Sequence, residues 1–150
     1  MQTPWGFLDF DAHEALHLIH DEPTGLRAII AVHSTHLGPA AGGTRYWHYA
    51  DDADALTDAL RLSRGMSFKN AMAGLPLGGG KAVILAPENR HKTPEQLAAF
   101  GLAIDRLGGQ YVTAEDVGMS VNDMIEIARQ TRFVAGLPVA GGAVGGDPGP

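Results

Sequence analysis

The chain has 150 residues, is 45% apolar and 19% charged, and contains 20 glycines and no cysteine, which fits one globular domain without disulfides or thiolate metal sites. The formal net charge of −6 and the lack of a basic stretch argue against a nucleic-acid partner. No apolar run approaches the roughly 20 residues that span a bilayer, and the first residues do not resemble a secretory signal, so we expect no membrane partner and a cytoplasmic location.

The first third of the chain predicts a β-hairpin followed by a helix. Residues 16–20 and the branched run 26–32 flank a turn-like segment, 21–25, which favours two paired strands. The alternative interpretation is a helix over residues 10–20. Residues 53–66 carry apolar side chains at helical spacing behind an acidic first turn, which predicts an amphipathic helix.

Strands and helices alternate through the rest of the chain. Residues 81–86 form a short branched run that predicts a buried strand, and a second strand is expected over 110–113. Thr93, Pro94 and Gln96 have the pattern of an N-cap, a first-turn proline and a capping-box partner for a helix reaching about residue 107. Another helix is expected over 120–130. The alternation predicts an α/β domain with a mixed sheet and flanking helices.

Residues 136–150 are rich in glycine and proline and predict a hinge or linker rather than a regular element. No GxGxxG sequence occurs, so the dinucleotide-binding fingerprint of a Rossmann domain is not found in this chain. We therefore expect one domain over residues 1–135, followed by a connector.

The chain has three lysines, and two of them have unusual surroundings. Lys92 lies in a polar stretch and is expected to be a solvated surface charge. Lys69 and Lys81 lie among glycine and apolar residues, where an ammonium partly stripped of water has a lowered pKa and suits general-base chemistry. The alternative is that each lysine buries its stem and extends its charged group to the surface.

Two acidic residues, Glu115 and Asp116, follow a predicted strand and precede a glycine-containing loop. Reactive groups are common at such strand ends in α/β proteins. An N-terminal cap for the following helix would explain acidic residues there equally well. Two lysines and one carboxylate could together bind an acidic group and transfer protons.

A zinc site is an alternative at residues 13–17, where His13, Glu14 and His17 match HExxH. This pattern binds zinc when both imidazoles lie on one face of a helix. It cannot form if His17 lies in a strand, so the hairpin prediction argues against a metal. His33 and His36 are expected to be structural or surface residues.

The segments LGPAAGGTRYW, DALRLSRGMSFKNAMAGLPLGGGKAVI and YVTAEDVGMSVNDM together resemble the N-terminal domain of the glutamate/leucine/phenylalanine/valine dehydrogenase family. The similarity runs from about residue 10 to the end, in the family's order and spacing. It implies a substrate-binding and oligomerisation domain, 1–135, with a hinge, 136–150, leading to a nucleotide-binding domain that this chain does not contain. It also implies a homo-oligomer.

The resemblance implies oxidative deamination of an L-amino acid to a 2-oxo acid and ammonia, with hydride transfer to NAD or NADP. Carried over by position, Lys69 would hold the substrate carboxylate, and Lys81 would activate water against the imino intermediate. Asp116 would exchange protons with the amino nitrogen. No residue of this chain is assigned to cofactor binding, and on its own the chain is expected to be inactive.

The resemblance also assigns residues around the substrate. Gly42 and Gly43 would let the backbone approach it closely, while Met66 and Ala114 would line its pocket, although core packing is an equal alternative for Met66. Glutamate-type members place a lysine before the glycine pair, whereas this chain has Ala41 there. An apolar substrate such as leucine, valine or phenylalanine, or its 2-oxo acid, is therefore expected, because a second buried carboxylate would lack a cation.

A non-catalytic assembly or ligand-binding module of the same fold is the competing interpretation. The presence of Lys69, Lys81 and Asp116 favours the enzyme, because an interaction module has no evident need for lysines in apolar surroundings.

Overall fold

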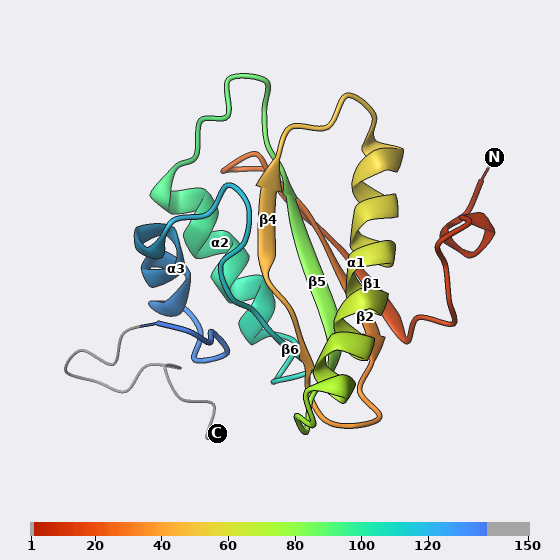
Figure 1. Cartoon of the computed structure of the whole chain (residues 1–150). Helices are drawn as coiled ribbons and strands as arrows, with labels where there is room; N and C mark the ends of the chain where they lie inside the picture. Colours follow the sequence, from red (N-terminus) through yellow and green to blue (C-terminus); the bar gives the residue numbers. More distant parts are fainter. Residues whose placement is uncertain (1, 138–150) are drawn as a thin grey trace.

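The computed structural model describes residues 2–137 and shows a mixed sheet of six strands with helices on both faces (Figure 1). The predicted α/β class is confirmed. Residues 138–150, most of the predicted hinge, lie outside the described residues, and the boundary at residue 135 stays a prediction. In the described part of the chain, no helix is both long and apolar enough to cross a bilayer.

The predicted hairpin is confirmed as strands β1 (Ala15–Asp21) and β2 (Leu26–Ser34), which pair antiparallel. Gly25, at φ +75°, closes the turn by donating its N–H to the Asp21 carbonyl at 2.8 Å. A residue with a side chain rarely adopts this conformation, which explains the glycine. The alternative helix over residues 10–20 is wrong.

The central strand β5 (Gly78–Leu85) pairs antiparallel with β2 and parallel with β3 (Ala40–Ala41) and β4 (Thr44–Trp47). The short strand β6 (Tyr111–Val112) pairs parallel with β3. The strand predicted from residue 81 begins earlier, at Gly78. A Cβ at Gly79 would lie 2.2 Å from the backbone nitrogen of Ser67, so this glycine lets the neighbouring helix pack directly on the strand.

One face of the sheet is covered by helix α1 (Asp52–Met72). It begins where the Asp51 side chain accepts a hydrogen bond from Ala53 N at 2.9 Å. Ala55 and Ala59 are buried against Ile29 and Val83, and these small side chains permit a close contact between helix and sheet. The predicted helix ended at residue 66, but the observed one continues to Met72 and therefore includes Lys69.

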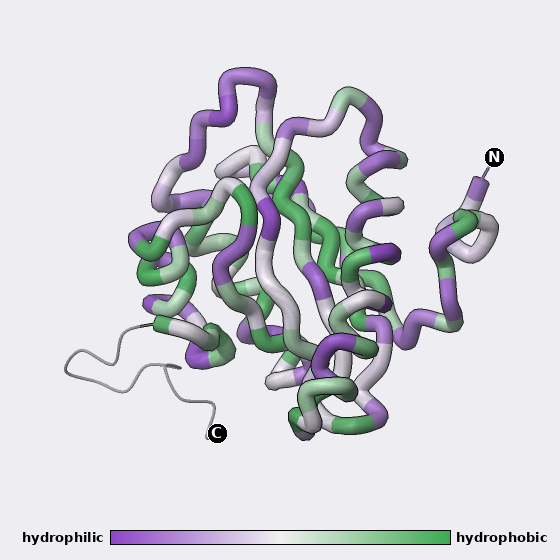
Figure 2. Tube along the Cα trace, viewed as in Figure 1, coloured by the Kyte–Doolittle hydropathy of each residue, from purple (hydrophilic) through white to green (hydrophobic). Residues whose placement is uncertain are grey.

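Helices α2 (Pro94–Asp105) and α3 (Val121–Ala128) cover the other face, and a short 3₁₀ helix, Pro4–Gly6, precedes β1. Thr93 caps α2 as predicted, but the Gln96 side chain donates to the Thr24 carbonyl, so the predicted capping-box partner is wrong. The capping box is found instead at Ser120 and Asp123 of α3. Figure 2 shows apolar segments along the central strands, with mostly hydrophilic residues in the loops at the top of the view.

Candidate functional site

The two unusual lysines and Asp116 line one cavity of about 310 Å³ on the side of the sheet that carries α1. The sequence-predicted site residues that line it are Ala41, Gly42, Gly43, Met66, Lys69, Lys81, Ala114 and Asp116. Val112, Thr113, Glu115 and Ala135 complete the wall. Residues from five separate stretches of sequence therefore meet in one place.

The glycine pair that lines the cavity lies between two short strands, since β3 ends at Ala41 and β4 begins at Thr44. Ala41 pairs with Gly79 and Thr44 with Ala82 in the same register, so Gly42 and Gly43 lie beside Gly80 and Lys81. On the other side, Thr44 N donates to Ala114 O at 2.8 Å. The parallel neighbours thus bring Lys81 and the segment after β6 to the same stretch of backbone.

Side chains at the glycine pair would collide with this arrangement. A Cβ at Gly42 would lie 1.7 Å from the Gly80 carbonyl oxygen, and one at Gly43 would lie 2.9 Å from the Cβ of Asp116. The glycines were expected to admit a substrate. Their observed contacts give an additional structural reason, because they let Asp116 approach the sheet closely enough to reach Lys81.

Lys81 is buried, and its ammonium group donates to Oδ2 of Asp116, which is about a quarter exposed. Burial by itself raises the pKa of Asp116, but the hydrogen bond and charge of Lys81, the backbone N–H of Val117 and the charge of Arg45 outweigh burial and hold this pKa below its ordinary value. The carboxyl group is therefore ionised at neutral pH. The alternative in which Lys81 extends to the surface is wrong.

Lys69 differs from Lys81 because it lies in the last turns of α1 and is exposed at the cavity wall, so the alternative of a lysine that extends to the surface is confirmed for Lys69. Its neighbour Asn70 is buried, and its side-chain amide donates to Gly78 O at 2.8 Å and to Ala41 O at 3.3 Å. This clamp fixes the end of α1 against β3 and β5. Asn70 thereby positions Lys69, a role that the sequence analysis did not detect.

A buried tyrosine contacts the backbone of the glycine pair. The Tyr111 hydroxyl donates to Gly42 O at 2.6 Å and lies 3.1 Å from the Thr113 hydroxyl. Burial raises the pKa of Tyr111, so its hydroxyl stays protonated and available as a donor. This contact too was not predicted.

Lys92 anchors the loop that follows Asp116, and its prediction as a solvated surface charge is wrong. Its ammonium group donates to Gly118 O at 2.5 Å and pairs with the Asp123 carboxylate, 4.7 Å from the centre of the Tyr46 ring. The carboxylate of Asp123 belongs to the capping box of α3. Glu115 and Asp116 do not cap that helix, because Ser120 does.

The HExxH pattern does not adopt the helical geometry that a zinc site of this kind requires. His17 lies in β1, opposite Ile30, while His13 lies before the strand and contacts Leu60 O at 2.9 Å. Glu14 accepts from Thr35 N and Oγ1. His33 is structural, since it contacts Ser67 and Asp11, and His36 is exposed.

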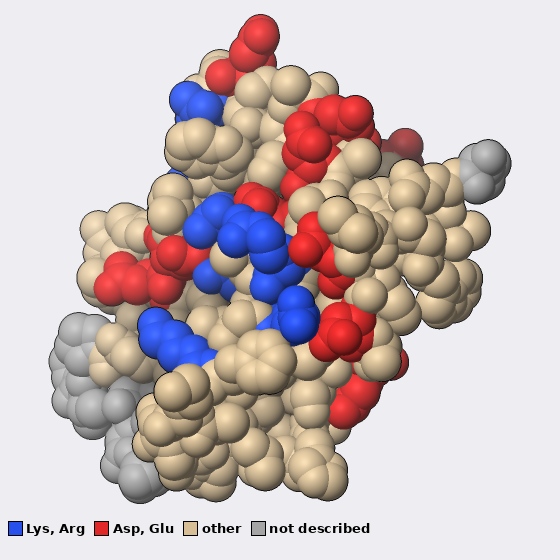
Figure 3. Space-filling model, turned by 45° about the vertical axis from the view of Figure 1, so that its right-hand side comes forward, with Lys and Arg blue, Asp and Glu red and all other residues tan. Residues whose placement is uncertain are grey.

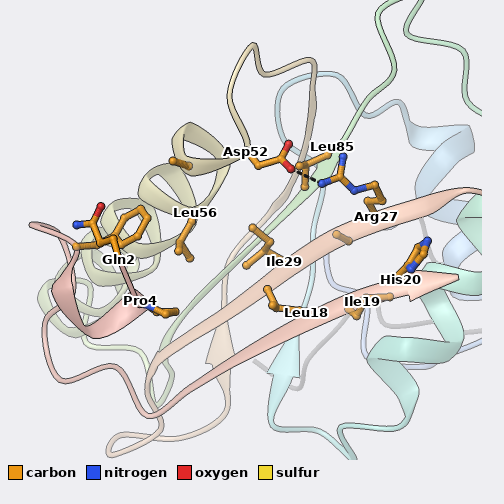
Figure 4. A pocket seen from close by; sticks show the side chains of 13 residues that line it. Gln2, Pro4, Leu18, Ile19, His20, Arg27, Ile29, Asp52, Leu56 and Leu85 are labelled. Carbon is orange, nitrogen blue, oxygen red and sulfur yellow. Dashed lines mark hydrogen bonds and ion pairs between the residues drawn. The ribbon is translucent and has the colours of Figure 1, made fainter.

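A larger groove, of about 440 Å³, lies elsewhere on the molecule (Figure 4). It is lined mainly by apolar residues of the N-terminal segment, β1, β2 and α1, including Pro4, Leu18 and Leu56, with an ion pair between Arg27 and Asp52. None of the predicted site residues lines this groove. The lining of this groove is mainly apolar, whereas the lining of the lysine-containing cavity includes the groups needed for acid–base chemistry.

Although the chain carries a net negative charge, Lys and Arg side chains gather in the middle of the face seen in Figure 3, bordered by Asp and Glu. Such a local concentration of positive charge attracts small anions despite the overall charge.

Comparison with known proteins identifies the group to which this domain belongs. Residues 13–133 match the family model described as Glu/Leu/Phe/Val dehydrogenase, dimerisation domain. This chain belongs to the Glu/Leu/Phe/Val dehydrogenase family. The match confirms the family that the sequence motifs resemble, and it covers every residue assigned to the cavity by the sequence analysis.

Two curated members of the family are similar over nearly the whole chain. Valine dehydrogenase of Streptomyces albus is 54% identical over 136 residues, which cover 90% of this chain and 37% of that protein. Leucine dehydrogenase of Bacillus subtilis is 51% identical over 138 residues, which cover 92% of this chain and 38% of that protein. The chain thus spans somewhat more than a third of the length of these relatives.

Solved structures show the same fold. L-tryptophan dehydrogenase from Nostoc punctiforme matches with a TM-score of 0.79 and 45% identity, over 82% of this chain and 37% of that one. The hetero-hexameric glutamate dehydrogenase from Thermus thermophilus matches with a TM-score of 0.70 at 20% identity, over 87% and 36% of the two chains. The latter likeness concerns the fold alone.

Proposed function

We propose that this chain is the substrate-binding part of an NAD-dependent dehydrogenase that oxidatively deaminates an apolar L-amino acid. The observation that carries the proposal is the meeting of Lys69, Lys81 and Asp116 in one cavity with an otherwise largely apolar wall. Membership of the family and the names of the valine and leucine relatives support it.

Lys69 is proposed to bind the substrate carboxylate. It is exposed at the cavity wall, so its ammonium group retains water until a substrate replaces it. A carboxylate held there would place the amino group and the Cα atom deeper in the cavity, toward Lys81. The backbone at Gly42 and Gly43 is proposed to contact the bound substrate.

Lys81 and Asp116 are proposed to carry the proton transfers. In the reaction, Cα loses a hydride and the amino nitrogen loses a proton, which gives an imine; water then adds and ammonia leaves. Asp116 would exchange the protons of the amino nitrogen, and Lys81 would activate the water molecule. Their direct contact gives a proton a short route between the two groups.

NAD would accept the hydride, and its binding is proposed to lie mainly in a further domain. The sequence holds no GxGxxG fingerprint, and no residue of the cavity is assigned to the nucleotide. We assign residues 1–135 to the substrate-binding and oligomerisation domain and residues 136–150 to the hinge. The choice between NAD and NADP would be made outside this chain.

The apolar substrate class is proposed from Ala41, Val112, Ala114 and Met66, which contribute apolar wall to the cavity. A substrate side chain with its own carboxylate would need a cation near Ala41. Ala41 leaves room for a branched or an aromatic side chain.

The test is a chimeric enzyme in which this chain replaces the corresponding part of the Streptomyces albus valine dehydrogenase. We expect NAD reduction with valine, leucine or phenylalanine and at least about a hundredfold lower kcat/KM with glutamate, since an unpaired buried carboxylate costs several kcal/mol. Efficient glutamate turnover would overturn the substrate class. A folded chimera that binds NAD but turns over none of these amino acids would instead favour the non-catalytic module.

A further inference from the structure

Arg45 lies next to the candidate catalytic carboxylate, although it does not line the cavity itself. It belongs to β4, in register with Val83 of β5, and so extends from the same face of the sheet as Lys81, two residues earlier in β5. Its Nε lies 3.6 Å from Asp116 Oδ2, the oxygen that accepts from Lys81. One carboxylate oxygen is therefore shared by two cations.

The other end of the guanidinium group is held by α1. Arg45 Nη1 donates to Asp58 Oδ2 at 3.3 Å, and the Tyr49 hydroxyl donates to the same oxygen at 2.7 Å. Arg61 donates to Oδ1 of Asp58 at 3.1 Å from the solvent side. Positive and negative groups alternate from Lys81 through Asp116, Arg45 and Asp58 to Arg61.

Asp58 is suited to hold this arginine. Burial by itself raises the pKa of Asp58, but hydrogen bonds from Tyr49 and Arg61 and the charge of Arg45 lower it below the ordinary value. Burial also raises the pKa of Tyr49, so its hydroxyl remains a donor. Asp58 is therefore a fixed anion between helix and sheet.

The guanidinium group of Arg45 lies between the carboxylates of Asp58 and Asp116. Its Nε is buried and makes no hydrogen bond within the described residues 2–137. At 3.6 Å it is too far from Asp116 for a normal hydrogen bond, but close enough for a strong charge interaction. Nη1 of the same guanidinium group donates to Asp58, while Oδ2 of Asp116 accepts from Lys81.

We propose that Arg45, held by Asp58, is a positioning residue that directs Oδ2 of Asp116 toward Lys81 and so sets the geometry of the proton-transfer pair. The inference rests on the proposed function, because it concerns the carboxylate assigned there to proton exchange. It adds Arg45 and Asp58, which do not contact the cavity, to the residues that determine its chemistry.

Other groups contribute to the field at Asp116. The titratable groups at or next to the cavity are Lys69 of α1, Lys81 of β5, Tyr111 of β6 and Glu115, which is adjacent to Asp116. Each of them is unchanged in the variants below. Differences between the variants therefore report on Arg45 and Asp58.

The test is a carboxyl NMR titration of Asp116 in the 150-residue chain, with the signal assigned by its loss in D116N. In R45M, we expect the pKa of Asp116 to rise by about one unit, because an opposite charge at this distance is lost. In D58N, we expect it to fall, because Arg45 is released toward Asp116. R64M is the matched control, since Arg64 lies on α1, the helix that carries Asp58, but pairs with Asp11.

The opposite directions separate positioning from a general structural role. If Arg45 and Asp58 merely stabilise the fold, both substitutions loosen the site and move the pKa upward, toward that of an unfolded chain. Upward shifts in both variants, no shift in R45M, or an equal shift in R64M would overturn the proposal. D58N alone decides it if R45M does not fold, since a fall supports the proposal and a rise or no shift contradicts it. The titration uses neither substrate nor NAD, so its outcome is independent of whether the chimeric enzyme is active.

Discussion

Ala41 occupies the position where the sequence resemblance places a lysine in glutamate-type members, and it lies at the cavity wall in β3. In the chimeric enzyme, A41K should lower kcat/KM for leucine or valine by about tenfold or more, because a cation would stand beside the apolar side chain. Turnover of glutamate should rise at the same time.

The control for that substitution is A41M, which adds length without charge. It should lower the activity with large apolar substrates through steric conflict and leave glutamate turnover low. If A41K and A41M have the same substrate profile, the charge at this position does not determine the substrate class.

The residues with reactive groups could be found from the sequence, but their supports could not. Lys69 and Lys81 were detectable because charged groups among glycine and apolar residues are unusual, and Asp116 because it follows a predicted strand and precedes a glycine-containing loop. Arg45 and Asn70 carry no such signal, since their roles arise from β4 and the last turns of α1 meeting distant carboxylate and carbonyl groups. Lys92 was misjudged because its partners, Gly118 and Asp123, lie in the α3 region rather than in its own polar stretch.

At the scale of elements, α1 contains a glycine that the packing does not require. A Cβ at Gly65 would meet nothing within 4 Å, whereas one at Gly79 would collide with the backbone of Ser67. G65A should therefore stabilise the chain by about 0.5–1 kcal/mol, since alanine favours a helix interior. G79A should destabilise it by about 2 kcal/mol or more through displacement of α1. Urea unfolding of both variants checks the pair, and equal effects would contradict this account of the helix–strand contact.

A buried histidine attaches the N-terminal segment to α1. Asp11 N donates to Nδ1 of His13, so the other ring nitrogen carries the proton and donates to Leu60 O. Burial is the main cause that lowers the pKa of His13. In the unfolded chain the imidazole binds its proton at higher pH, so the stabilising contribution is present above about pH 6.5 and is lost as the pH falls below it.

Replacement of this histidine should weaken that pH dependence. H13Q should lose less thermal stability than the original chain between pH 7 and pH 5, while H36Q, at an exposed histidine, should behave like the original chain. Melting temperatures measured across this range test the prediction. An unchanged pH dependence in H13Q would show that other groups dominate.

The element predictions succeeded where the signal was local and failed where it depended on neighbours. The hairpin followed from branched residues and a glycine turn, and α2 from its threonine cap. Helix α1 was predicted too short because Gly65 and the residues around Lys69 weaken the apolar periodicity, although contact with β5 continues to stabilise the helix. Strands β3 and β4 were not predicted, because their few residues become strands through pairing with β5 and β6.

At the scale of the whole molecule, exposed apolar side chains on the N-terminal segment and β1 support the proposed homo-oligomer. Trp5 is 74% exposed, Leu8 97% and Leu18 75%, and Leu18 also lines the groove in Figure 4. Trp5 and Leu18 line one pocket, and exposed apolar surface of this kind is typical of protein–protein contacts. The family model is described as a dimerisation domain.

Sedimentation velocity can test this surface. L18E should weaken self-association by about tenfold or more, because a charge would be buried in the contact. L102E is the control, since Leu102 is exposed on α2, on the other side of the sheet. Equal weakening by both substitutions, or a monomeric original chain, would contradict the proposed surface.

We propose that the cavity holding Lys69, Lys81 and Asp116 performs the chemistry, while another domain binds the nucleotide. The most direct measurement is kcat/KM of the chimeric enzyme with leucine or valine for K81M and D116N, beside R106M, which removes an exposed charge outside the cavity. We predict that K81M and D116N each lower kcat/KM by about 10²–10⁴-fold with unchanged NAD affinity, whereas R106M has little effect. Near-normal turnover in K81M or D116N would contradict the claim.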